Sequence, residues 1–147
     1  MCPGTMQDPH TPATILVLDD EPAIRRLHER YLAVAGYRCI GVETLADALR
    51  TLQEQPIDVA LLDVRLASGN GLLLAHNIRE YFPGTATIMI TGLADVATAT
   101  EAMRAGAIDY IVKPVSADTL RKSVAHVLHR AQGDRSRTRL SEQLGAE

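Results

Sequence analysis

The chain has 147 residues, of which 46% are hydrophobic and 22% charged, and these proportions exclude wholesale disorder and a fibrous repeat. Fifteen lysines and arginines against eighteen aspartates and glutamates leave a net charge of −3, and only 3% of the residues are aromatic, so we expect no nucleic-acid-binding surface. The absence of long apolar runs argues against a membrane protein, and the two cysteines, Cys2 and Cys39, make no disulfide framework, which favours a cytoplasmic location.

Composition divides the sequence into three parts. Residues 1–13 contain three prolines and no periodic pattern, which predicts a flexible leader. Residues 14–131 alternate short apolar runs with helical patterns, which predicts one domain. Residues 132–147 are polar with clustered arginines, which predicts a polar tail or the start of a linker.

Five short aliphatic or β-branched runs in this domain predict strands. In chain order they are Ile15–Leu18, Tyr37–Val42, Ile57–Leu62, Thr87–Ile90 and Ile108–Val112. Helical stripes lie between them, at Ile24, Leu27, Tyr31 and Leu32 and again at Leu45, Ala48, Leu49 and Leu52. The expected helix boundaries are a start at Pro22, N-caps at Asn70, Asp95 and Ser116, and ends at Gly36 and Gly106.

This alternation predicts an α/β fold with a doubly wound, mostly parallel sheet and helices on both faces. The apolar run Val59–Leu62 is expected in the centre of the sheet, buried on both sides. The run Tyr37–Val42 is interrupted by Arg38 and Gly41, which favours an edge strand.

Polar residues follow four of the predicted strands, where an open α/β sheet binds its ligands. They are Asp19 and Asp20 after the first strand, Asp63 after the third, Thr91 after the fourth and Lys113 after the fifth. Carboxylates gathered at one edge repel each other unless a cation intervenes, and hard oxygen ligands favour Mg²⁺. Lys113 adds a positive charge that could bind an anion, and Thr91 adds a hydroxyl donor. Together with the carboxylates, these residues predict a phosphoryl-transfer site with Asp63 as nucleophile.

From about Thr14 to Arg130 the sequence resembles the receiver domains of bacterial two-component response regulators. The resemblance is carried by Val17-Leu18-Asp19-Asp20-Glu21-Pro22, Leu61-Leu62-Asp63-Val64, Ile90-Thr91-Gly92 and the run from Ala105 to Lys113-Pro114. It implies a five-stranded, flavodoxin-like sheet with strand order 2-1-3-4-5.

The resemblance also implies a role for each residue of the site. Asp63 would accept the phosphoryl group, Thr91 would hydrogen-bond that group, and Lys113 would pair with it. The Mg²⁺ ligands would be Asp19, Asp20, Asp63 and the backbone carbonyl of Arg65. Tyr110 matches the aromatic switch position of the family, and the Lys113–Pro114 peptide bond is expected to be cis.

The function implied by the resemblance is a conformational switch driven by phosphorylation. The phosphoryl donor would be a sensor histidine kinase or a phosphotransfer protein. The chain itself would be no enzyme beyond self-catalysed phosphorylation and slow autodephosphorylation. The sequence does not decide the oligomeric state, but if a homodimer forms, we expect it to use the face of the fourth helix, fifth strand and fifth helix.

The loop after Asp63 departs from the family pattern. Receiver domains often have proline four residues after the acceptor, whereas this chain has Ala67, so the loop is expected to be more mobile. Gly71 fits the glycine usual in the family. Arg65 and Leu93 lie two residues beyond the acceptor and the threonine, where we expect them to screen water and tune the phosphoryl lifetime.

Other functions and plainer roles stay open at this stage. The functional alternatives are a phosphatase with an aspartate nucleophile and a nucleotide- or flavin-binding domain of the same topology. Asp19 and Asp20 could simply cap a helix, and Tyr110 could be a core aromatic. The pair His126 and His129 is expected at the solvated surface, and the arginines after Arg130 in a solvated linker.

Overall fold

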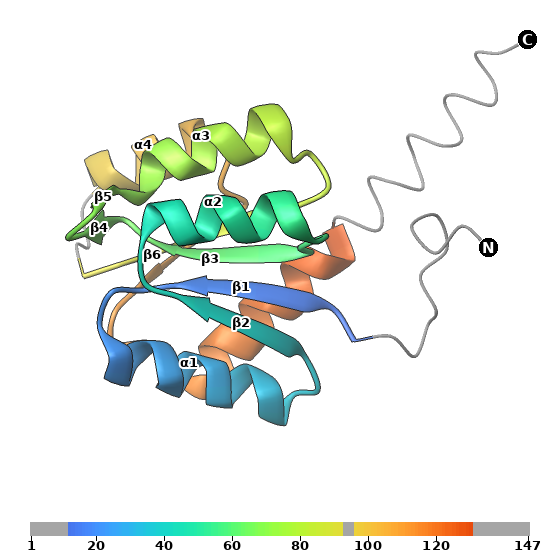
Figure 1. Cartoon of the computed structure of the whole chain (residues 1–147). Coiled ribbons are helices and arrows are strands. Elements are labelled where there is room, and N and C mark those ends of the chain that lie inside the picture. The colour runs from blue at the N-terminus through green and yellow to red at the C-terminus, as the bar shows by residue number, and fades with distance from the viewer. Residues whose placement is uncertain (1–11, 93–95, 131–147) are drawn as a thin grey trace, which may run out of the picture.

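The computed structural model describes residues 12–92 and 96–130, which form a five-stranded parallel sheet between two layers of helices (Figure 1). The strands of this sheet lie in the order β2-β1-β3-β6-β7. Their bounds are Thr14–Leu18 for β1, Arg38–Val42 for β2, Val59–Asp63 for β3, Ala86–Thr91 for β6 and Asp109–Val112 for β7. Counted along the chain, this is the predicted order 2-1-3-4-5, and the predicted α/β fold is confirmed.

Four labelled helices and one further helical segment connect or follow the strands. They are α1 (Pro22–Val34), α2 (Leu45–Glu54), α3 (Gly71–Tyr81), α4 (Val96–Arg104) and residues 117–130. A two-stranded hairpin, β4 (Arg65–Leu66) with β5 (Gly69–Asn70), lies between β3 and α3, and the sequence analysis did not predict it.

The sheet separates two hydrophobic cores. The first core lies under α2, α3 and α4 and includes Leu52, Ile78 and Ala102. The second lies under α1 and the helix of residues 117–130 and includes Leu32 and Val124. All five residues of β3 are buried, as its central position requires, whereas β2 at the edge of the sheet contains none that are buried.

Local sequence features explain where the helices begin and end. α1 starts with Pro22, and Asn70 caps α3 by accepting a hydrogen bond from the N–H of Leu72. Ser116 accepts from the N–H of Thr119 at the start of the last helix. Gly36 and Gly106 have φ angles of +94° and +105°, in the left-handed region that lets a helix end there. The predicted cap Asp95 lies outside the described residues.

The two ends of this folded body lie at the same edge of the sheet. The chain enters at the amino end of β1, and the helix of residues 117–130 runs antiparallel to the strands, so it too finishes at their amino ends (Figure 1). The β4–β5 hairpin and the carboxyl ends of the strands are at the opposite edge. Among the described residues, no helix has the length and apolar character needed to cross a membrane. The predicted leader and tail fall almost wholly outside the described residues.

Candidate functional site

Three carboxylates lie together at the carboxyl ends of β1 and β3. Asp19 and Asp20 directly follow β1, and Asp63 is the last residue of β3. The two strands are hydrogen-bonded neighbours, with Leu18 opposite Leu62, so their ends reach the same edge of the sheet. One ligand oxygen from each carboxylate lies within 4.8 Å of the others. These three residues are called the acidic rim below.

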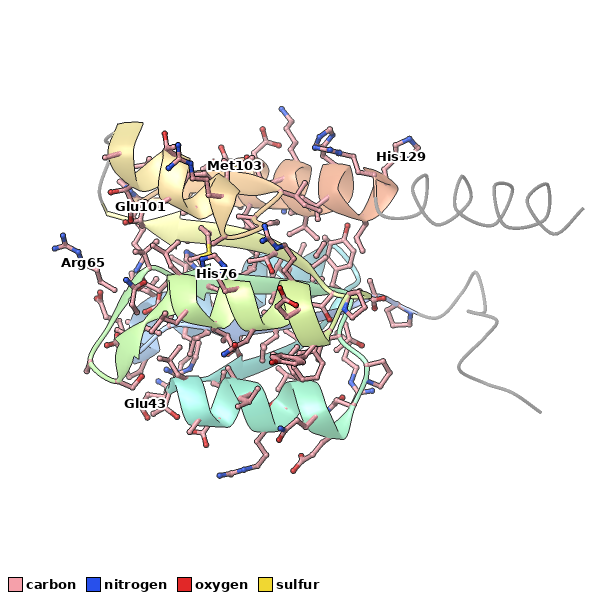
Figure 2. The ribbon with its side chains drawn as sticks, turned by 90° about the horizontal axis from the view of Figure 1, so that it is seen from above. Glu43, Arg65, His76, Glu101, Met103 and His129 are labelled. Carbon is pink, nitrogen blue, oxygen red and sulfur yellow. The ribbon has the colours of Figure 1, made fainter. Side chains whose placement is uncertain are left out.

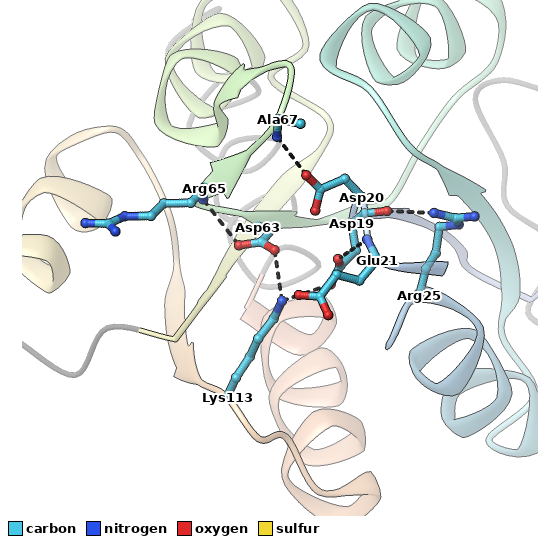
Figure 3. A network of polar contacts seen from close by, with 8 residues as sticks. All are labelled: Asp19, Asp20, Glu21, Arg25, Asp63, Arg65, Ala67 and Lys113. Carbon is cyan, nitrogen blue, oxygen red and sulfur yellow. Dashed lines mark hydrogen bonds and ion pairs between the residues drawn. The ribbon is translucent and has the colours of Figure 1, made fainter. Parts of the chain in front are cut away.

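A lysine from β7 completes the rim (Figure 3). Lys113 follows the last residue of β7, and its Nζ donates to Oδ2 of Asp63 at 2.9 Å and to Oδ2 of Asp19 at 3.1 Å. The backbone N–H of Lys113 donates to the carbonyl of Thr91 at 2.7 Å, which fixes the lysine against the end of β6. The Lys113–Pro114 bond is cis, as predicted. One ammonium therefore bridges two carboxylates.

Each of the three carboxylates also accepts a hydrogen bond from a backbone N–H. Oδ1 of Asp63 accepts from the N–H of Arg65 at 3.3 Å, and Oδ1 of Asp19 accepts from the N–H of Glu21 at 2.9 Å. Oδ2 of Asp20 accepts from the N–H of Ala67 at 2.7 Å. These bonds orient the carboxylates without adding positive charge.

The Arg65 side chain is turned out of the rim. It runs away from the carboxylate of Asp63 in the close view (Figure 3) and projects from the body of the molecule (Figure 2). The side chain is exposed, whereas the backbone N–H donates to the carboxylate of Asp63. The other predicted screening residue, Leu93, lies outside the described residues.

The electrostatics of the rim follow from its burial. Asp19 is 2% exposed and Asp63 is 7% exposed. Burial raises the pKa of the Asp63 carboxyl above its ordinary value; contacts with Lys113 oppose this shift, and the charge of Asp19 adds to it. Burial alone would lower the pKa of Lys113, but its hydrogen bonds and charge interactions with Asp63 and Asp19 together raise it. The lysine therefore stays protonated.

The donor set fits a hard divalent cation. Three carboxylates against one ammonium leave two negative charges at the rim, which one divalent ion would balance. All three side chains offer oxygen, and neither sulfur nor imidazole belongs to the cluster. This chemistry suits Mg²⁺ better than zinc or copper.

The two predicted switch residues lie on the neighbouring strands. Thr91 is the last residue of β6 and only 1% exposed, which places it beside the rim at the carboxyl end of its strand. Tyr110 lies in β7 opposite Met89 of β6, is half-buried, and packs against the first core.

Gly71 has a part in the site that the sequence analysis recognised only as a family match. A Cβ at this position would lie 2.1 Å from the backbone oxygen of Asp63. The N–H of Gly71 also donates to the carbonyl of Val64 at 2.9 Å. The start of α3 therefore packs directly on the backbone of Asp63, and only glycine leaves room for this contact.

Comparisons with known proteins agree with this geometry. A family model described as the response regulator receiver domain matches residues 15–125. The alginate biosynthesis transcriptional regulatory protein AlgB of Pseudomonas aeruginosa is 40% identical over 114 residues, which cover 78% of this chain and 25% of that protein. The chain spans about a quarter of the length of the curated relatives it matches first.

Solved structures show the same fold. NtrX from Brucella abortus superposes with a TM-score of 0.83 and 31% identity, over 88% of this chain and 30% of that one. A CheY-like response regulator receiver domain protein from Methanospirillum hungatei superposes with a TM-score of 0.80 and 27% identity, over 84% of this chain and 99% of that one.

Proposed function

Because the chain belongs to the family of response regulator receiver domains, we propose that Asp63 accepts a phosphoryl group from a sensor histidine kinase or a phosphotransfer protein. The observation that carries this assignment is the position of Asp63 within the rim. Its Oδ2 accepts from the ammonium of Lys113 at 2.9 Å, and its carboxylate belongs to the cluster that could hold a metal. This is the arrangement that phosphoryl transfer needs.

The transfer joins an oxygen of Asp63 to phosphorus. A P–O bond forms as the P–N bond to the donor imidazole breaks, and the imidazole leaves with the electron pair and takes a proton from solvent. Lys113 stays protonated and stabilises the negative charge of the phosphoryl oxygens. The ligands for Mg²⁺ would be Asp19, Asp20, Asp63 and the backbone carbonyl of Arg65. When bound, Mg²⁺ would neutralise charge on the phosphoryl group.

The added charge favours a second conformation of the domain. The Thr91 hydroxyl would turn to the phosphoryl oxygens, and Tyr110 would follow it inward. The buried position of Thr91 at the end of β6 and the place of Tyr110 on the adjacent strand β7 support this coupling. The change would reshape the face of α4, β7 and residues 117–130, which would serve the downstream partner or a homodimer.

Dephosphorylation without a partner would be slow. A phosphatase with an aspartate nucleophile needs a second acid near the leaving group, and the residue two positions after Asp63 is Arg65, whose side chain points away (Figure 3). With slow hydrolysis, the chain would act as a switch and not as an enzyme. We place this switch in the cytoplasm, with no nucleic acid or membrane bound by the described residues. Equal hydrolysis rates of the phosphorylated wild type and Arg65→Ala would contradict a role of this side chain in the phosphoryl lifetime.

The assignment of Asp63 is tested by thermal melts with Mg²⁺ and beryllofluoride, a phosphoryl mimic. A ligand that binds only the folded state raises the melting temperature by mass action. We expect a modest rise with Mg²⁺, a further rise with the mimic, and loss of that further rise in Asp63→Asn. Asp118→Asn, which removes an exposed acid paired with Lys122 on the last helix, is the matched control. A full response to the mimic in Asp63→Asn would disprove the assignment.

A further inference from the structure

The hydrogen bond from Ala67 to Asp20 joins the acidic rim to the β4–β5 hairpin. Lys113 contacts Asp19 and Asp63, so these two carboxylates are held by a side-chain cation. Asp20 is held from a different direction, by the backbone N–H of Ala67 at 2.7 Å, across 47 positions of sequence (Figure 3). Asp20 is also more exposed than the other two carboxylates.

The hairpin that carries Ala67 is itself anchored to α2. The Oγ of Ser68 accepts a hydrogen bond at 3.2 Å from the N–H of Leu45, the first residue of that helix. This N–H has no partner within the helix, so Ser68 supplies the acceptor that it needs. A Cβ at Gly69 would lie 2.8 Å from Cδ1 of Leu45, and the Leu45 side chain packs against the first core. The turn is thus fixed to the helix by a hydrogen bond and a close contact.

We propose that the β4–β5 hairpin is a clasp that positions Asp20 for Mg²⁺ through the backbone N–H of Ala67. The proposal rests on the proposed function, since it concerns a ligand of the same site. A carboxylate has two oxygens, so the bond from Ala67 to Oδ2 leaves the other oxygen available to a cation. Hydrogen bonds to metal-ligating carboxylates typically strengthen metal binding about 10- to 100-fold, because they orient the ligand.

The clasp also couples Mg²⁺ binding to the order of the hairpin, so that each stabilises the other. If a firmly held Asp20 binds Mg²⁺ more tightly, then bound Mg²⁺ must stabilise the hydrogen bond from Ala67 to the same degree. Through Ser68 and Leu45 this stabilisation reaches the start of α2. A loop without this bond would leave Asp20 to adopt other rotamers, and each binding event would then have to order it.

The substitution Ala67→Pro tests the clasp because proline lacks the N–H donor. We expect the backbone to accept proline here, because the preceding Leu66 is in a β-strand and Ala67 does not have a positive φ. We expect Mg²⁺ affinity, measured by calorimetry, to fall about tenfold in Ala67→Pro and much less in Ala67→Gly, which keeps the N–H. Equal affinities of wild type and Ala67→Pro, or equal losses in both variants, would overturn the proposal.

Hydrogen exchange of the Ala67 amide in the unmodified protein is a second readout that needs no variant. Exchange should slow when Mg²⁺ is added, because the ion and the N–H hold the same carboxylate. Unchanged or faster exchange would overturn the clasp, since Asp20 would then leave Ala67 to reach the metal. Ser68→Ala, which removes the anchor, should weaken Mg²⁺ binding by a smaller factor than Ala67→Pro. A wild type that fails to bind Mg²⁺ at all would instead contradict the proposed function.

Discussion

The ammonium of Lys113 lies 2.9 Å from Oδ2 of Asp63 and 3.1 Å from Oδ2 of Asp19, and so bridges residues from the ends of two neighbouring strands. Lys113 thus supplies a positive charge to the acidic rim. Lys113 and a bound divalent ion would both reduce the repulsion between the same carboxylates. Under the proposed function, this overlap would make the lysine a competitor of the metal as well as a partner of the phosphoryl group.

Lys113→Met should therefore weaken the metal-free fold and strengthen metal binding. Removing the ammonium leaves two buried carboxylates without their cation, at a cost of about 2 kcal/mol of unfolding free energy. Mg²⁺ should then bind about tenfold more tightly, because the rim is more negative. Denaturant titrations with and without Mg²⁺ measure both effects. Lys122→Met, which breaks an exposed pair, should change stability by less than about 0.5 kcal/mol.

The pH dependence of this effect follows from the raised pKa of Lys113. A group whose pKa is raised in the folded state contributes stability that is present below its unfolded pKa and is lost as the pH rises through the folded pKa. The stability difference between wild type and Lys113→Met should therefore persist at neutral pH and shrink in strongly alkaline solution, where the ammonium loses its proton. A difference that vanishes near neutrality would contradict the bridge.

Asp63→Asn should stabilise the metal-free protein. Burial raises the pKa of Asp63, so the ionised carboxylate is disfavoured by folding. The contribution of Asp63 to the stability of the fold is most favourable below its unfolded pKa and is lost as the pH rises through the folded pKa. At neutral pH, therefore, the buried ionised carboxylate destabilises the fold. The amide avoids this destabilisation, and we expect a melting temperature about 2 °C higher at neutral pH, with a smaller gain in acid. A melting temperature below that of the wild type would show that the contact with Lys113 dominates instead.

Gly71→Ala should destabilise the fold although alanine is the better helix former. The new Cβ would lie 2.1 Å from the backbone oxygen of Asp63, so either α3 or the end of β3 must shift. We expect a loss of about 1–3 kcal/mol, measured by urea denaturation, together with a weaker response to the phosphoryl mimic. Gly84→Ala is the control, because a Cβ there meets nothing within 4 Å. A stabilised Gly71→Ala would contradict the contact with Asp63.

His28 should make the protein less stable in mild acid. It lies on α1 and is 3% exposed, and burial lowers its pKa, an effect only partly offset by Asp19. Folding favours the neutral form of the imidazole. The stability that His28 contributes is therefore present above its unfolded pKa and is lost as the pH falls through the folded pKa. His28→Leu should show a smaller drop in melting temperature between about pH 7.5 and about pH 5.5 than the wild type. His126→Leu, which removes an exposed histidine, is the control substitution.

The sheet could be predicted from the sequence because its strands are short apolar runs, and because the composition of each run indicates whether the strand is central or at the edge. The run Val59–Leu62 is buried on both sides in the centre of the sheet, and the interrupted run at Tyr37–Val42 is at its edge. Asp19, Asp63 and Lys113 could be found for a related reason. Each directly follows or ends a strand, and parallel strands bring their carboxyl ends to one edge.

The hairpin and its contacts could not be predicted in the same way. Its strands have two residues each, too few for any periodic pattern. The donor to Asp20 is a backbone N–H, which every residue except proline has, so the side chain of Ala67 gives no indication of it. His28 was missed although it could have been found. It lies four residues after Ile24 and four before Leu32, on the face of α1 that packs on the sheet.

Because the amino end of β1 and the finish of the last helix share one edge, the opposite edge is clear of both. A matrix, fluorophore or fused domain joined directly at Thr14 or at Arg130 would therefore stand on the far side from Asp63. A phosphohistidine donor could then dock on an immobilised sample in the same orientation as on the untethered protein.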